Sequence, residues 1–99
     1  MEPKPRFLIE HGTSWRGWAR RVPEGERDEI TARLAELQGA FGHPHLHSGL
    51  GLRRLRGDAF EFRASRARRV IFLFVKPHRL RLLMVGNHDD VRTWLRENL

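Results

Sequence analysis

The chain has 99 residues, a length that fits one folded domain over residues 1–99 with a single core. It carries 19 Lys and Arg against 12 Asp and Glu, for a formal net charge of +7, and 39% of its residues are hydrophobic. This composition is typical of a globular basic protein and excludes a disordered basic tail. The absence of cysteine excludes disulfides, thiolate zinc sites and a cysteine nucleophile, and it fits the reducing cytoplasm.

The apolar segments are too short for a membrane protein. The longest, Val70–Val75, has six residues, whereas a helix needs roughly 20 to cross a bilayer. Residues 1–6 contain two prolines and no apolar stretch of the kind found in signal peptides. We therefore expect a soluble cytoplasmic protein that does not bind membranes.

The positive charge is concentrated in the second half of the chain. Residues 1–47 carry seven basic and seven acidic side chains, whereas residues 48–99 carry twelve basic and five acidic ones. Of the 19 cations, 17 are arginine, whose planar guanidinium donates paired hydrogen bonds to phosphate. Such a patch indicates binding to nucleic acid or to an acidic protein. A solvated face enriched in arginine is the alternative interpretation.

The first half of the chain predicts one strand and two helices. Residues 6–10 form a short apolar run that predicts a strand. Thr13 and Ser14 are suitable N-caps for a short helix over 15–21. The clearest helix runs over 26–40, because apolar residues recur there on one face of a 3.6-residue period. These apolar residues are Ile30, Leu34, Leu37 and Phe41.

The second half predicts a loop, three strands and a final helix. Residues 43–51 contain one proline and two glycines and predict a loop. Apolar side chains alternate over 60–64 and 80–85, as in strands with one buried face, whereas residues 70–75 are all apolar, as in a central strand. Asn87 is a suitable N-cap for the last helix.

The predicted order of elements is β-α-α-β-β-β-α. It defines an α+β fold in which two N-terminal helices pack on a mostly antiparallel sheet. Helices are expected to cover one face of this sheet. The other face is expected to present Glu61 and Arg63 to solvent.

Four short motifs resemble those of the RelE/ParE superfamily, small toxins of type II toxin–antitoxin systems. They are LRRLRG at 52–57, FEFR at 60–63, RVIF at 69–72 and VGNHDDV at 85–91. The resemblance covers residues 7–97 and implies a RelE/ParE-like fold. RelE-like members cut mRNA, many of them on the ribosome, whereas ParE-like members inhibit DNA gyrase, and the fold alone does not decide between these activities.

The resemblance implies an mRNA-cleaving toxin without cofactor or metal, whose partners are mRNA, the ribosome and a cognate antitoxin that can form a hetero-oligomer with it. RNA cleavage of this kind needs groups that move protons and cations that stabilise the phosphorane. Imidazole suits the first role and guanidinium the second. His88 matches the family's catalytic position after a strand-ending glycine, and Arg69 matches the strand arginine that contacts the scissile phosphate.

The remaining candidates are a histidine and several arginines. Certain family members place a working histidine before the second strand, which makes His47 the third catalytic candidate. His43, His45 and His47 alternate, so in an extended chain they could face one side, an arrangement also open to zinc, but no carboxylate or cysteine lies near them. The RNA-binding candidates are Arg53, Arg54, Arg56, Arg63 and Arg92.

Arg92 stands where many ribonuclease members carry an aromatic residue, four positions after His88. Two other functions therefore remain open. A ParE-like gyrase inhibitor would act by binding alone, and a non-catalytic basic module would bind nucleic acid in a salt-sensitive manner. The histidine at position 88 favours the ribonuclease.

Overall fold

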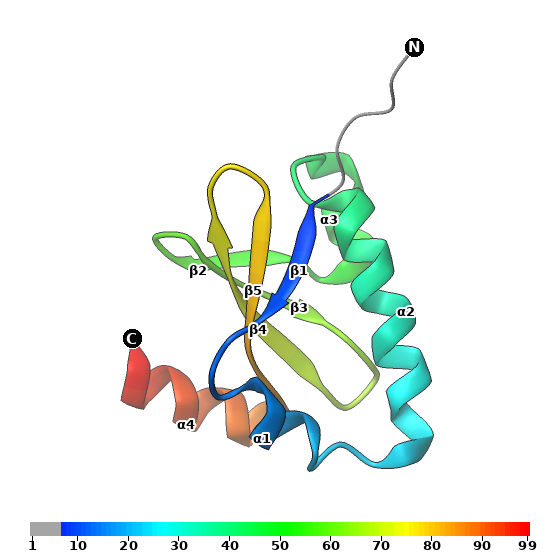
Figure 1. The fold of residues 1–99 in the computed structure, drawn as a ribbon, viewed down its shortest axis with the longest axis vertical. Helices are drawn as coiled ribbons and strands as arrows, with labels where there is room; N and C mark the ends of the chain where they lie inside the picture. Colours follow the sequence, from blue (N-terminus) through cyan, green and yellow to red (C-terminus); the bar gives the residue numbers. More distant parts are fainter. Residues whose placement is uncertain (1–6) are drawn as a thin grey trace.

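The computed structural model describes residues 7–99 (Figure 1). Within them the chain forms four helices and five strands. In chain order these are β1 (Leu8–His11), α1 (Trp15–Ala19), α2 (Glu24–Ala40), α3 (Pro44–Leu50), β2 (Arg53–Arg56), β3 (Ala59–Arg63), β4 (Arg69–Val75), β5 (Arg79–Gly86) and α4 (His88–Asn98).

The strands form one sheet in the order β1-β5-β4-β3-β2. The pairs β2–β3, β3–β4 and β4–β5 are antiparallel, whereas β1 pairs with β5 in parallel, with Leu8 opposite Arg79. Strands β1 and β2 are therefore the two edges. The combination of helices with this mostly antiparallel sheet confirms the predicted α+β class.

Helices cover both faces of the sheet, with α2 and α4 on opposite sides (Figure 1). Leu37 of α2 packs with the main apolar cluster, which includes Phe72 of β4. A smaller cluster on the other face joins Ile71 to Val91 of α4. The expectation that this second face presents Glu61 to solvent is wrong, because its side chain is buried there. Arg63 is exposed, as predicted.

The prediction of a loop over 43–51 is also wrong, because Pro44–Leu50 forms α3. Pro44 lies in the first turn, where its missing N–H costs nothing. Gly51 ends the helix with a φ of +62°, a conformation that suits glycine. The proline and glycine that favoured a loop are the start and stop signals of a short helix.

The other predicted elements are confirmed, with shifted ends. Strand β1 begins at Leu8. Arg6, the first residue of the predicted strand, lies outside the described residues. The prediction that residues 1–6 form no signal peptide also falls outside them. Helix α1 ends at Ala19, and Ser14 precedes it without a side-chain capping hydrogen bond. The edge strand β2 was not predicted. No helix within residues 7–99 has the length and apolar composition needed to cross a bilayer.

Candidate functional site

A pocket of about 150 Å³ lies where β3 ends and where β4 and α4 begin. Arg63 and Arg69 face each other across β3 and β4, and Gly86 faces Arg69 from β5. His88 follows two residues later, so the antiparallel pairing brings it to the same pocket. The lining residues are Arg63, Ser65, Arg66, Ala67, Arg68, Arg69 and His88. Three of the predicted site residues thus share one pocket.

The start of α4 fixes the backbone of His88. The Asn87 side chain accepts a hydrogen bond from the Asp90 N–H at 2.9 Å, and the Asp90 carboxylate accepts one from the Asn87 N–H at 3.0 Å. This reciprocal pair is a capping box and confirms Asn87 as the N-cap. Gly86 permits the tight turn, because a Cβ there would lie 2.5 Å from that of Asp90. The His88 side chain is exposed and makes no hydrogen bond within residues 7–99, so its imidazole is available to a ligand.

Two acidic side chains partly balance the arginines around the pocket. Glu26 of α2 accepts hydrogen bonds from Ser65 and Arg68, both at 3.2 Å, and so fastens the turn after β3 to α2. Glu61 of β3 pairs with Arg53 and, at 3.3 Å, with Arg69. The guanidinium groups of Arg63 and Arg66 have no acidic partner among the described residues. The pocket therefore keeps positive charge for an anion such as phosphate.

His47 lies away from this pocket. Its Nε2 is 3.1 Å from the carbonyl oxygen of Ala40, and its ring stacks on Phe41 with 6.2 Å between the ring centroids. Because α3 is a helix, the predicted alternation of His43, His45 and His47 along an extended chain is wrong. Residues 7–99 contain no cluster of three His, Cys, Asp or Glu side chains that could hold a metal ion.

The remaining predicted arginines lie on the surface outside the pocket. Arg53, Arg54 and Arg56 are exposed on the edge strand β2, and Arg54 lies over the Phe60 ring at 5.5 Å. Arg56 donates a hydrogen bond to the Leu99 carbonyl, 2.9 Å away. Arg92 is exposed on α4, about one turn after His88. None of these four side chains lines the His88 pocket.

Sequence reasoning missed Arg66 and Arg68 as residues that line the pocket, and Glu61 as the partner of Arg69. The available signal was the run 63–69, which holds four arginines in seven residues. The run indicates a basic turn, but it does not show that the turn folds back beside His88. Glu61 is buried on the sheet face against which α4 packs, and α4 lies far along the chain.

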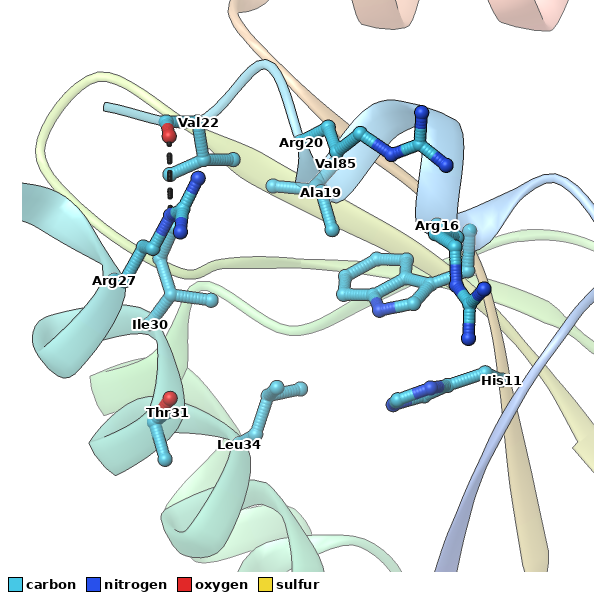
Figure 2. Close-up of a pocket in the computed structure, with 11 residues that line it drawn as sticks. His11, Arg16, Ala19, Arg20, Val22, Arg27, Ile30, Thr31, Leu34 and Val85 are labelled. Atoms are coloured by element: carbon cyan, nitrogen blue, oxygen red, sulfur yellow. Dashed lines mark hydrogen bonds between the residues drawn. The ribbon is translucent and has the colours of Figure 1, made fainter. Parts of the chain in front are cut away.

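A second and larger cavity, of about 380 Å³, lies between α1, α2 and β5 (Figure 2). It shares no residue with the His88 pocket. Its walls are largely apolar, formed by Trp15, Ala19, Val22, Ile30, Leu34 and Val85. Arg16, Arg20 and Arg27 also line it. Among residues 7–99, the Arg27 side chain donates a hydrogen bond to the Val22 carbonyl at 3.3 Å, whereas the Arg16 and Arg20 side chains make none (Figure 2). The cavity therefore combines an apolar interior with cations that have no acidic partner among the described residues.

No protein-family model matches the sequence, and no curated protein is significantly similar to it. Solved structures do match. A mutant of the Escherichia coli toxin RelE in the free state superimposes with a TM-score of 0.68 at 13% identity, over 96% of this chain and 100% of that chain. The RelE–RelB complex from Pyrococcus horikoshii matches with a TM-score of 0.65 at 14% identity, over 82% and 93%.

The RelB–RelE antitoxin–toxin complex from Methanococcus jannaschii matches with a TM-score of 0.61 at 14% identity, over 88% of this chain and 96% of that one. In all three matches the superposition covers at least 82% of this chain. The chain therefore has the fold of the RelE toxins.

Proposed function

We propose that the chain is the toxin of a type II toxin–antitoxin pair and an endoribonuclease that cuts mRNA on the ribosome, so that translation stops. The observation that carries this proposal is that Arg63, Arg69 and His88 share one basic pocket. The fold supports the toxin role, because similar structures are RelE toxins, two of them in complex with RelB antitoxins.

The chemistry proposed for the pocket is an attack within the RNA strand. The 2′-hydroxyl oxygen attacks the adjacent phosphorus and loses its proton, the bond from phosphorus to the 5′-oxygen breaks, and the leaving oxygen gains a proton. The products are a 2′,3′-cyclic phosphate and a 5′-hydroxyl. This sequence needs a proton-transfer group and cations, and no cofactor or metal.

Each role has a side chain in the pocket. The imidazole of His88 serves one of the two proton transfers, because imidazole ordinarily titrates near neutral pH. The guanidinium groups of Arg69 and Arg63 bind the non-bridging phosphate oxygens, where negative charge grows in the phosphorane. We assign His47 no role in proton transfer, because its imidazole is hydrogen-bonded to the Ala40 carbonyl outside the pocket. The RNA backbone is bound by four exposed arginines outside the pocket, which are Arg53, Arg54 and Arg56 of β2 and Arg92 of α4.

Induced expression is expected to arrest growth and to create new mRNA 3′ ends within ribosome-protected regions. His88→Ala should remove both effects, because a general acid or base contributes about 10²- to 10⁴-fold to rate. Growth curves, translation rates and mapped mRNA 3′ ends provide the measurement.

His78→Ala is the matched control, since His78 is exposed in the turn between β4 and β5 and should keep the wild-type effect. Growth arrest with intact mRNA would contradict the ribonuclease. DNA-damage signalling with cleaved plasmid would then indicate gyrase inhibition, and salt-sensitive RNA binding without arrest would indicate a non-catalytic module.

The cavity of Figure 2 suits the antitoxin partner. Its apolar walls fit apolar side chains of a bound segment, and Arg16 and Arg20 fit acidic side chains on the same segment. The antitoxin is expected to be a small acidic protein encoded beside this chain. The toxin and antitoxin would form a hetero-oligomer.

Reversal of both charges, Arg16→Glu with Arg20→Glu, is expected to weaken antitoxin binding by about 100-fold, because acidic groups would face each other across the contact. Calorimetry of the purified pair measures the affinity. The matched control is Lys76→Glu with Arg96→Glu, two reversals at exposed positions that do not line the cavity. Equal affinity of the two double variants would place the antitoxin elsewhere.

A further inference from the structure

Glu61 is a buried carboxylate to which the proposed reaction gives no role. It lies in the middle of β3, and its side chain is 1% exposed. Its Oε1 accepts hydrogen bonds from Nε of Arg53 and from Nη1 of Arg69, the latter at 3.3 Å. Its Oε2 has no hydrogen-bond partner among the described residues. Because an unpaired buried oxygen costs free energy, a glutamate at this position calls for an explanation.

The strand register places this carboxylate beside the candidate site. Arg63 faces Arg69 across β3 and β4, and like charges in such a pair repel each other. Glu61 precedes Arg63 by two residues, so both side chains lie on the same face of the sheet. Glu61 therefore supplies a negative charge beside Arg69 that offsets this repulsion.

The contact with Glu61 involves only one nitrogen of the Arg69 guanidinium. Nη1 is bonded to Glu61, whereas Nε and Nη2 have no hydrogen-bond partner within residues 7–99. These two nitrogens form a side of the guanidinium that donates two parallel hydrogen bonds, the geometry that suits phosphate. Arg69 is 30% exposed and lines the His88 pocket, so a ligand can reach it.

Arg53 is the second arginine that binds the Glu61 carboxylate. It is opposite Glu61 in the register of β2 and β3 and bonds the same oxygen. Its side chain is 67% exposed, so it can reach Glu61 while it remains largely in solvent. The carboxylate is thus held between an edge-strand arginine and the arginine of the pocket.

We propose that Glu61 is a positioning residue for Arg69: it holds Nη1 so that Nε and Nη2 are presented to the scissile phosphate. This inference rests on the proposed ribonuclease function. Glu61 itself does not line the pocket and is not expected to touch the RNA. Its effect on the reaction passes through the orientation of the guanidinium.

Glu61→Gln tests the charge at nearly constant shape. Cleavage of an RNA substrate is expected to lose about 10-fold in kcat with KM within about twofold of wild type, because a misdirected donor costs rate more than binding. Glu61→Met removes the polar group and should lower kcat at least as much. The thermal midpoint of Glu61→Met should be lower than that of wild type, because the variant leaves the partly buried Arg69, opposite Arg63, without its carboxylate partner.

An unchanged or increased kcat in both variants would overturn the inference, and an increase would mean that Glu61 competes with phosphate for Arg69. A double-mutant cycle separates positioning from general damage. In an Arg69→Ala background, Glu61→Gln should have no further effect on kcat, because its target is absent. The same loss in both backgrounds would refute a role through Arg69.

A measurement that does not depend on RNA cleavage tests this inference separately from the proposed function. The exchange of the Arg69 Nη1 and Nη2 signals in ¹⁵N spectra, assigned with Arg69→Lys, should be slower in wild type than in Glu61→Gln, because the hydrogen bond from Nη1 to Glu61 opposes rotation about the Nε–Cζ bond. If the wild-type protein cleaves no RNA, the proposed function fails while this comparison still decides whether Glu61 orders Arg69. Identical exchange rates would overturn the positioning role whatever the activity.

Discussion

Arg69→Ala is expected to lower the rate of RNA cleavage by about 100- to 1,000-fold, the usual loss when one transition-state donor is removed. Arg69 begins β4, faces Gly86 of β5, and lies in the same pocket as His88. Loss of its guanidinium would leave the developing phosphorane charge to Arg63 and the neighbouring arginines. Single-turnover cleavage at saturating protein measures the effect, because this assay separates chemistry from binding.

Arg96→Ala is the control for the loss of one positive charge. Arg96 is exposed near the end of α4 and does not line the pocket. Its replacement should leave the single-turnover rate near wild type, and both variants should unfold at similar denaturant concentrations. Equal rates for Arg69→Ala and wild type would remove Arg69 from the proposed mechanism.

Phe72→Ala is expected to lower the free energy of unfolding by about 3–5 kcal/mol. Phe72 is fully buried in β4, and its ring lies 5.6 Å from Phe41, 5.6 Å from Phe60 and 6.0 Å from Phe62, measured between centroids. Truncation would leave a cavity among these rings. Because small domains have only about 5–15 kcal/mol of stability, the variant should be close to unfolding.

Urea unfolding followed by circular dichroism measures this change. Leu46→Ala is the control, because Leu46 is 46% exposed on α3, and its replacement should change the stability by no more than about 0.5 kcal/mol. A smaller loss for Phe72→Ala than for Leu46→Ala would contradict the description of the core.

Local signals predicted most of the fold. The apolar period of α2 predicted the buried residues Ile30 and Leu37, and Asn87 predicted the start of α4. Helix α3 was missed because proline and glycine at 43–51 are compatible with either a loop or a capped helical turn. Strand β2 was missed because Leu55 is the only apolar residue in Arg53–Arg56. The strand pairs with β3, but its sequence shows no alternation of apolar and polar residues.

The site residues that lie in the sequence motifs could be predicted, whereas those that depend on packing could not. The resemblance singled out Arg69 and His88, and the antiparallel return of β5 along β4 brings them to one pocket. Alternation in β3 placed Glu61 on the face away from α2, and this part of the prediction holds. The structure also shows that α4 packs on this face and that Glu61 is buried there. Both features depend on contacts between distant segments, which no local sequence pattern records.

The pairing of β1 with β5 has a consequence for how the protein is made. The first strand of the sheet lies against the last one, with Leu8 opposite Arg79, so β1 has no partner until β5 has left the ribosome. At about 5–20 residues per second, synthesis of the intervening chain takes seconds. His88 follows β5 directly, so a nascent chain in which β5 is still inside the exit tunnel has no assembled pocket. The order of synthesis thus delays the proposed activity until the sheet can close.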